Sequence, residues 1–446
     1  MTIVVIGGDA AGMSAAARIV RKDKGSKVIV FEKTNIVSYG ACGLPYYISG
    51  VNDDIELVKM RSPEEFRKDG VDLRTGHEVT GIDVKNKSVT VHNLADGIVF
   101  EQKYDKLLIA SGSRAIFPPV EGRDLENVFV LKTISDAEAI KATLLRDDIR
   151  RVAVIGGGFI GLEVTESIIR RKKQVLLFET MEHVMTAYDE PFQLAAEKCL
   201  SDNGAELHMS ETVIEITGEN GLVNGIVTPK GKYGVDMVIF AIGVRPNTDI
   251  VPDDLFKKLP NGAIIINDSM ETGVEDVYAA GDCATVYNKI TQKQDYIALG
   301  SNANKQGRLV GDALLGLEVH FDRAMGSNML RVLDIELGKT GVSEKEAKAN
   351  GMNYGTAMVT AQSHSPYYTA PPPSDLTAKI VYDLDSKVIL GAQIMGEREA
   401  AMRINIFACA IDRQMTTEEL GMLDLAYSPS LTFVWDIEHI VSNVVK

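Results

Sequence analysis

One pattern occurs twice in this chain and restricts its fold more than any other feature. In the first copy, an apolar strand at 3–6 leads through a glycine-rich turn into a helix at about 12–22, and a strand at 27–31 then ends at Glu32. Such a turn brings backbone N–H groups and a helix N-terminus to a pyrophosphate, and the final acid accepts ribose hydroxyls. The pattern predicts a dinucleotide-binding βαβ unit.

The second copy lies in the middle of the chain. A strand at 151–155 and a glycine-rich turn precede a helix that ends at about 171, and a strand at 175–178 ends at Glu179. A single glycine-rich turn is weak evidence, but both copies stand between a strand and a helix and end at an acid. We therefore expect two bound dinucleotides, and the turn residues expected to face them are Gly7, Ala10, Ala11, Gly12, Gly156, Gly158, Phe159, Ile160 and Gly161.

Two acidic side chains refine this expectation. Asp9 stands where the middle glycine of the first turn belongs. Because a carboxylate would repel a pyrophosphate, we expect Asp9 to turn away and cap the following helix. Glu179 would repel the 2′-phosphate of NADPH, so we expect NADH to be preferred over NADPH.

The rest of the chain divides around the two units. Each is followed by an apolar strand that ends in glycine, at Ser111-Gly112 and at Gly243, and a third buried strand ends on Asp282. From about residue 326 the pattern changes to alternating strands and an amphipathic helix at about 397–413. We expect an α/β fold with two Rossmann-like three-layer domains, at 1–115 with 246–325 and at 116–245, and a C-terminal α+β domain at 326–446.

Charge and cysteine content narrow the function classes. The formal net charge of −15 argues against nucleic acid or an anionic membrane as the main partner. No stretch reaches the ~18 apolar residues of a membrane helix. Four cysteines without paired spacing fit a reducing compartment, so we expect a cytoplasmic protein. No His/Cys cluster has metal-ligand spacing, and no metal is expected.

Cys42 lies ten residues beyond Glu32, and Tyr47 occupies the position where a second cysteine would close a local disulfide. We therefore expect Cys42 to exchange electrons with a small molecule or an oxygen species. To leave as a thiolate it needs a depressed pKa, which we expect from electropositive surroundings. Cys199, Cys283 and Cys409 are expected to be structural.

These motifs resemble the pyridine nucleotide-disulfide oxidoreductase superfamily over essentially the whole chain. The single Cys42 is similar to the branch that holds coenzyme A-disulfide reductases, NADH oxidases, NADH peroxidases and persulfide reductases. The resemblance implies FAD in the first unit, NAD(P)H in the second and a homodimer formed by the C-terminal domain. It implies that Asp282 bonds the flavin ribityl chain, that Phe159 and Glu163 flank the nicotinamide side of the flavin, and that Cys42 faces the other side. The remaining cofactor residues expected are Glu32, Lys33, Ser111, Gly112, Glu179 and Gly243.

Three places bear on the electron acceptor. Oxidases and peroxidases of the branch typically have a histidine in the first turn, where this chain has Ala10. Coenzyme A-disulfide reductases use two tyrosines, and the matching candidates are Tyr427 and either Tyr367 or Tyr368. Basic residues match positions that hold coenzyme A phosphates in relatives, although a solvated face would look the same. The substrate-binding residues expected are Arg18, Arg21, Lys22, Ser38, Arg61 and Asn304.

The sequence therefore predicts an FAD-dependent NAD(P)H oxidoreductase that reduces coenzyme A disulfide, or coenzyme A persulfide or polysulfide, through Cys42. Coenzyme A bound to Cys42 is a further expected ligand, and each active site is expected to be shared across a homodimer. One alternative is an NADH oxidase that reduces O2 to H2O2 or water. An alternative of another class is a flavoprotein redox sensor or electron-transfer partner.

Overall fold

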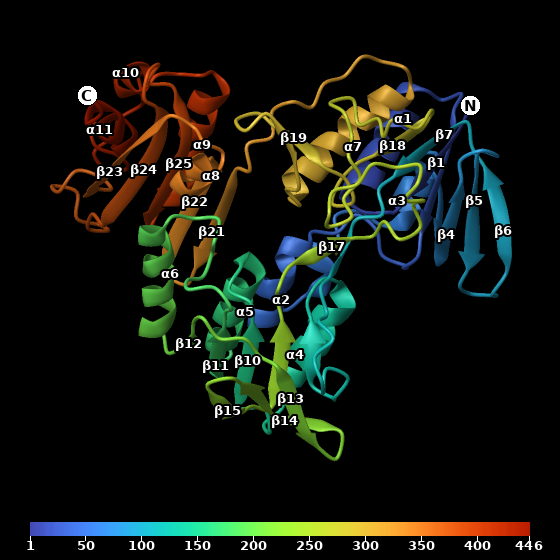
Figure 1. The fold of residues 1–446 in the computed structure, drawn as a ribbon, viewed down its shortest axis with the longest axis horizontal. Coiled ribbons are helices and arrows are strands. Elements are labelled where there is room, and N and C mark those ends of the chain that lie inside the picture. The colour runs from blue at the N-terminus through green and yellow to red at the C-terminus, as the bar shows by residue number, and fades with distance from the viewer.

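The computed structural model describes residues 1–446, which form three lobes (Figure 1). The first lobe is built on a five-stranded parallel sheet of order β18-β7-β1-β2-β3. Apart from the edge strand at 72–75, which is mostly polar, the strands carry apolar runs because both faces of such a sheet are buried. They are β1 (Thr2–Ile6), β2 (Lys27–Glu32), β3 (Asp72–Thr75), β7 (Lys106–Ile109) and β18 (Val277–Ala279), with helices α1 (Ala10–Lys22) and α7 (Gly300–Leu314) packed together beside them.

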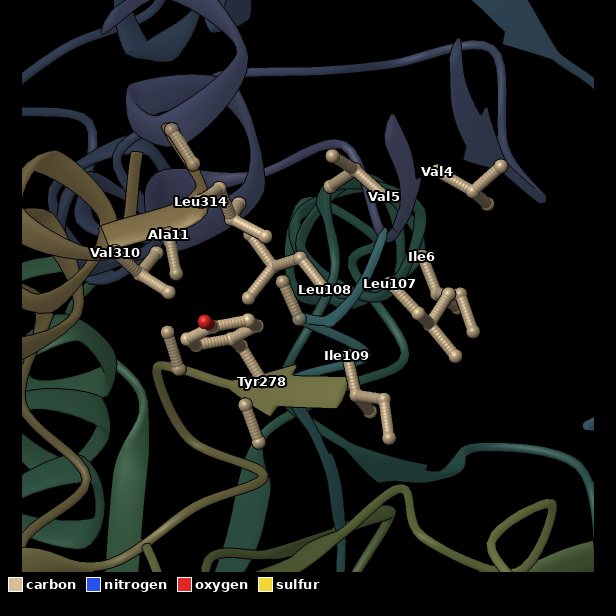
Figure 2. Packing of buried hydrophobic residues seen from close by; sticks show 14 of the residues in the cluster. Val4, Val5, Ile6, Ala11, Leu107, Leu108, Ile109, Tyr278, Val310 and Leu314 are labelled. Atoms are coloured by element: carbon tan, nitrogen blue, oxygen red, sulfur yellow. The ribbon is translucent and has the colours of Figure 1, made fainter. Parts of the chain in front are cut away.

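Figure 2 shows how this core joins segments that are far apart in the sequence. Side chains of β1 and β7 lie together with Tyr278 of β18 and with α1 and α7. Residues 1–115 and 246–325 therefore contribute to one hydrophobic cluster. The smaller elements of this lobe are α3 (Pro63–Lys68), β4 (His77–Asp83), β5 (Ser88–Asn93), β6 (Val99–Lys103), β19 (Val286–Asn288) and β20 (Lys293–Asp295).

The second lobe, at the bottom of Figure 1, repeats the parallel architecture with the order β12-β11-β10-β16-β9. Its strands and helices are β9 (Val128–Val130), α4 (Ile134–Leu144), β10 (Arg151–Ile155), α5 (Phe159–Arg170), β11 (Gln174–Phe178), α6 (Glu190–Asp202), β12 (Glu206–His208) and β16 (Met237–Phe240). An antiparallel sheet of β13 (Glu215–Glu219), β14 (Leu222–Thr228) and β15 (Gly231–Gly234) covers it. The chain enters and leaves this lobe through the antiparallel pair β8 (Ser113–Ala115) and β17 (Val244–Pro246).

The third lobe is a five-stranded antiparallel sheet of order β21-β22-β25-β24-β23 with helices packed on it. Its elements are β21 (Asn328–Val332), β22 (Ile335–Gly341), α8 (Glu344–Ala349), β23 (Tyr354–Gln362), β24 (Asp375–Asp383), β25 (Ile389–Gly396), α9 (Ala400–Asp412), α10 (Thr417–Gly421) and α11 (Ile437–Asn443). Helix α9 begins three residues later than expected because Glu399 has a left-handed φ of +58°.

The predicted α/β fold, with two Rossmann-like units and a C-terminal α+β part, is confirmed. The domain boundaries given above stay a proposal, which the single crossing at β8 and β17 supports. None of the helices combines the length and the apolar character that crossing a membrane would demand.

Candidate active site

The first glycine-rich turn connects β1 to α1. Gly7 has a φ of +105°, and a side chain at Gly12 would collide with the Gly7 carbonyl oxygen, so both positions require glycine. At the end of β2 the Glu32 carboxylate accepts a hydrogen bond from the Gly8 N–H at 2.9 Å. The acid at the strand end therefore lies against the turn, at the position where the motif needs a ribose acceptor.

Asp9 does not cap α1 with its side chain, so that prediction is wrong. Its Oδ1 instead accepts the N–H of Tyr39 at 3.1 Å, which ties the turn to the loop that leads to Cys42. Burial raises the pKa of the Asp9 carboxyl to about 6, against the opposing effects of the Tyr39 N–H and the Lys132 ammonium. Nearby expected cofactor residues are Ala10 and Ala11, which begin α1, and the exposed Lys33.

The second turn repeats this geometry between β10 and α5. Gly156 has a φ of +111°, a side chain at Gly161 would collide with the Gly156 carbonyl oxygen, and Glu179 accepts the Gly157 N–H at 2.6 Å. A Cβ at Gly158 would meet no atom within 4 Å, and no side chain caps α5. The N–H groups at the start of α5 therefore face open space, which fits a dinucleotide pyrophosphate.

A polar cluster lies beyond the carboxyl ends of β7 and β18. Asp282 Oδ2 accepts the Ser113 hydroxyl at 2.9 Å and pairs with Lys132 Nζ at 3.3 Å. Tyr296 donates its hydroxyl to the Asp282 backbone carbonyl at 3.0 Å. Asp282 therefore has a fixed position at the sheet edge where such folds bind nucleotides. The expected residues at the corresponding strand ends are Ser111, Gly112 and Gly243, the two glycines with φ of +67° and +105°.

Cys42 is exposed in the short helical turn Ala41–Gly43, which runs directly into α2 (Leu44–Ser49). Protein atoms around the sulfur raise the pKa of this thiol by desolvation, and the Glu163 carboxylate adds to the rise while Lys132 opposes it. The expectation of a depressed Cys42 pKa is therefore wrong for the single chain, because desolvation and a carboxylate outweigh the one cation.

Glu163 lies in the second turn of α5, behind Phe159 and Ile160 at the start of that helix. Burial, helped by the neighbouring Glu166 carboxylate, raises the pKa of Glu163 to about 7. Burial also raises the pKa of the Tyr46 hydroxyl on α2, with Glu163 and Cys42 contributing. The structure therefore brings the expected residues Cys42 and Glu163 into one electrostatic neighbourhood, which α2 and α5 share.

The candidate tyrosines lie elsewhere, in the third lobe. The hydroxyls of Tyr367 and Tyr427 form a hydrogen bond at 2.7 Å, and both side chains are exposed. Hydrogen bonds from Ser365 and Tyr427 lower the pKa of Tyr367. Tyr368 instead packs edge-on against His364. Of the two candidates, Tyr367 is therefore the one that pairs with Tyr427. Tyr367 lies in the loop between β23 and β24, which Figure 1 shows at the outer edge of the third lobe, away from α2.

The expected substrate-binding residues fall into two groups. On the seam between α1 and α7, Arg18 and Lys22 both pair with Asp312, and Asn304 accepts the Ser14 hydroxyl at 3.0 Å. In the second group, Ser38 accepts the Met60 N–H through its backbone, next to Arg61, whose guanidinium pairs with Asp69 at 2.7 Å. Arg21 is exposed and bonds only the Ala17 carbonyl. No side-chain hydrogen bond or ion pair joins the two groups.

Two residues of this neighbourhood were missed from the sequence. Lys132 pairs with Asp282, and its charge opposes the rise in the pKa of both Asp9 and Cys42. It follows β9 in a stretch without a recognisable motif. Tyr46 has no motif of its own, and its position four residues after Cys42, in α2, is the signal that could have identified it.

Family models match most of the chain. The model described as pyridine nucleotide-disulphide oxidoreductase covers residues 1–307, and the model of the dimerisation domain of the same proteins covers residues 329–437. Both matches agree with the division between the two parallel-sheet lobes and the third lobe.

Curated relatives extend over almost the full length. An NADH oxidase of Enterococcus faecalis is 34% identical over 447 residues, covering 99% of each chain. A CoA-dependent NAD(P)H sulfur oxidoreductase of Pyrococcus abyssi is 35% identical and covers 100% of this chain and 98% of its own. Among solved structures, a NAD-dependent persulfide reductase from A. fulgidus matches with a TM-score of 0.95 at 33% identity, covering 100% of this chain and 83% of that chain.

Proposed function

This chain belongs to the pyridine nucleotide-disulphide oxidoreductase family and is an oxidoreductase, and we propose that it reduces coenzyme A disulfide, or coenzyme A persulfide or polysulfide, through Cys42. The observation that carries the proposal is the exposed Cys42 thiol, which neighbours Glu163 and Lys132 and has no second cysteine beside it. Its sulfur is therefore free to bond to an external sulfur.

The cofactors are FAD and a nicotinamide dinucleotide, as in the family. When bound, FAD supplies the means to accept a hydride and to pass an electron pair to sulfur. On the protein side, the first turn with Glu32 and the cluster around Asp282 would hold FAD. The second turn, with Glu179 in reach of the adenosine ribose, would hold NADH in preference to NADPH.

Cys42 performs the sulfur step. Its thiolate attacks one sulfur of the disulfide, forms a mixed disulfide and releases the other half as a thiolate. An electron pair that originates from NADH then breaks the mixed disulfide and leaves a second free thiol together with the Cys42 thiolate. Desolvation and Glu163 raise the pKa of Cys42, and Lys132 opposes this rise and so favours the thiolate form.

The Tyr367–Tyr427 pair would supply the protons. Two hydroxyls 2.7 Å apart share a hydrogen bond, and this bond together with one from Ser365 lowers the pKa of Tyr367. Because the pair lies in the dimerisation part of the chain, away from α2, we place it over Cys42 of the partner subunit in a homodimer. Each active site is then shared across the two-fold axis.

Basic residues would hold the coenzyme A phosphates. Arg18 and Lys22 already face one carboxylate, Asp312, so a phosphate must compete with this carboxylate or bind beside it. Arg21, Arg61, Ser38 and Asn304 complete the proposed substrate surface.

Oxygen is the second candidate acceptor, because relatives such as the Enterococcus faecalis protein are named NADH oxidase. Ala10 argues against oxygen as the acceptor, because the first turn then has no imidazole that could hydrogen-bond a sulfenate formed at Cys42 or exchange a proton with it. A sensor or electron-transfer role would make Cys42 dispensable.

Two measurements test the proposal. Intact mass of the protein as purified should show a coenzyme A adduct that maps to Cys42. NADH turnover should be faster with coenzyme A disulfide than with oxidised glutathione or with oxygen alone. Turnover with oxygen only, and no thiol released from any disulfide, would overturn the proposed substrate class.

A further inference from the structure

The helix that follows Cys42 belongs by sequence to the first lobe but is packed against the second. Leu44 and Ile48 of α2 are buried in the same hydrophobic cluster as the β10 and α5 side chains. Only Gly43 separates Cys42 from this helix. The position of the redox sulfur is therefore set by the lobe that carries the second glycine-rich turn.

Polar contacts from α5 hold α2 near both of its ends. The Ser167 hydroxyl, which is 1% exposed, lies 2.9 Å from the Pro45 carbonyl in the first turn of α2. Arg171, just after α5, donates its Nε–H to the Ile48 carbonyl at 2.8 Å. Its guanidinium also covers Gly50, where a Cβ would come within 2.7 Å of it.

A second helix supports the same segment. Lys141 of α4 pairs with Asp53 at 2.8 Å, and its ammonium lies 3.7 Å from the centre of the Tyr47 ring. Lys141 is buried in the second lobe, and Asp53 lies four residues beyond α2. The ion pair therefore fixes the chain just beyond α2 to the second lobe. The segment from Leu44 to Asp53 is thus attached to α4 and α5 along its length.

Helix α5 has contacts of a different kind at its other end. Gly158 and Phe159 begin it at the open face of the second turn, and Glu163 stands one turn further on. The single hydroxyl proton of Ser167 is shared between the Pro45 carbonyl and the Glu163 carbonyl, which lies 2.7 Å from the Ser167 oxygen. Since an α-helix is held by a continuous ladder of backbone hydrogen bonds, a shift at its N-terminus moves Ser167 and Arg171 with it.

We propose that α5 couples the dinucleotide side to the sulfur side, with Ser167 and Arg171 as positioning residues that transmit occupancy of the second turn to Cys42. The inference rests on the proposed function only in taking the second turn as the nicotinamide dinucleotide site and Cys42 as the reactive sulfur. It does not depend on which acceptor is used.

The test measures how fast Cys42 reacts with iodoacetamide, followed by mass analysis of its peptide. The FAD-loaded dimer is first reduced at cysteine, freed of reductant and kept anaerobic. NAD+ is the probe, because it occupies the dinucleotide site without delivering a hydride. In the wild type, saturating NAD+ should change the rate about fivefold or more, the lower range of ordinary coupling between sites.

Ser167→Ala removes one hydroxyl from the middle of a helix, and Arg171→Ala removes the second link. In at least one of them the NAD+ effect should fall to less than half its wild-type size, although NAD+ still binds as judged by flavin fluorescence. Arg150→Ala is the matched control, since Arg150 is an exposed cation at the same end of the lobe with no side-chain bond to α2.

Two results overturn the coupling: a wild-type rate that NAD+ changes by less than about fivefold, or an NAD+ effect that stays above half its wild-type size in both variants. If Arg171→Ala does not fold, Ser167→Ala decides. If the coupling is absent, the wild-type protein can still reduce the disulfide. The result is therefore distinguishable from failure of the proposed function.

Discussion

The two glycine-rich turns share one geometry and differ in what stands in front of the helix. In both, an acid from the following strand accepts a turn N–H, Glu32 from Gly8 and Glu179 from Gly157. The third turn position differs. Asp9 of the first turn is partly buried and bonded to Tyr39, whereas Gly158 of the second is exposed and has open space around it.

If FAD occupies the first turn and the nicotinamide dinucleotide the second, as proposed, this difference distinguishes a binding site that is part of the fold from one that stays accessible. The first turn is tied through Asp9 to the loop that leads to Cys42, and the Asp282 cluster lies at the edge of the same sheet. The second turn leaves the start of α5 accessible. The first arrangement suits a cofactor that stays bound, and the second suits a dinucleotide that enters and leaves in each turnover.

Cys42→Ser should remove the reaction of the sulfur that is tied to the first turn and leave the reaction with NADH at the second turn intact. Disulfide reduction should fall by roughly 10³-fold or more, because no second cysteine stands beside Cys42 to form the mixed disulfide in its place. NADH-dependent reduction of an artificial dye should stay within about twofold of wild type, since it needs no sulfur. Steady-state assays with both acceptors check this, with Cys409→Ser as the control for an exposed cysteine outside the site. Full disulfide turnover by Cys42→Ser would contradict the sulfur step.

Tyr427→Phe should slow disulfide reduction about 10- to 100-fold, because the proposed proton-donating pair loses one of its two hydroxyls. Tyr368→Phe should change it little, since that side chain packs on His364 instead. Steady-state rates of the two variants and the wild type with coenzyme A disulfide check this difference.

The same variant tests the shared site. Refolding Tyr427→Phe together with Cys42→Ser should form heterodimers with one intact site each. Random pairing should then restore about a quarter of wild-type activity above the residual level of the two variants. No gain, from variants shown to exchange subunits, would mean that both residues act within one chain.

Glu179→Arg tests whether the second turn selects NADH over NADPH. Removing a carboxylate and adding a cation near the adenosine ribose should shift the ratio of NADH to NADPH efficiency about 10-fold or more toward NADPH. Measured kcat/KM for both dinucleotides checks this. A wild type that already favours NADPH would contradict the placement of Glu179. Glu32→Arg should leave the ratio unchanged in whatever fraction still holds FAD.

Asp9→Asn should have the smallest effect, on stability. Burial raises the pKa of Asp9 to about 6 from its ordinary 3.8, so the folded chain binds this proton more tightly than the unfolded chain. The associated stability is present below about pH 4 and lost as the pH rises to about 6. At pH 7.5 Asp9→Asn should therefore be more stable than wild type by roughly 1–3 kcal/mol, and near pH 4 the two should be equal.

Denaturation at the two pH values measures this difference. Asp124→Asn is the control, because this carboxylate is exposed. Equal stability of wild type and Asp9→Asn at pH 7.5 would contradict the burial of Asp9.

The sequence predicted what local patterns encode. The two repeats, their glycines and the acids at the strand ends were found because each is specified within about thirty residues of chain. Contacts between distant segments could not be predicted in the same way. Asp9 meets Tyr39, Lys132 meets Asp282, and α2 packs on the second lobe only because tertiary folding brings these segments together.

The Cys42 error has the same origin. A depressed pKa was expected from the chemistry that a redox thiol needs, but desolvation and Glu163 are contributed by packing that no short motif contains. The choice of Tyr367 over Tyr368 likewise depends on a loop whose path the two adjacent tyrosines do not reveal.

An anaerobic titration with NADH tests the central claim most directly, because it counts the electrons that the protein accepts. If Cys42 is the redox sulfur, wild-type protein treated with coenzyme A disulfide and freed of excess should take up one electron pair beyond that of the flavin. The extra pair should release one coenzyme A thiol per active site, and Cys42→Ser should lack both. Uptake limited to the flavin in the wild type, or an unchanged extra pair in Cys42→Ser, would contradict the account.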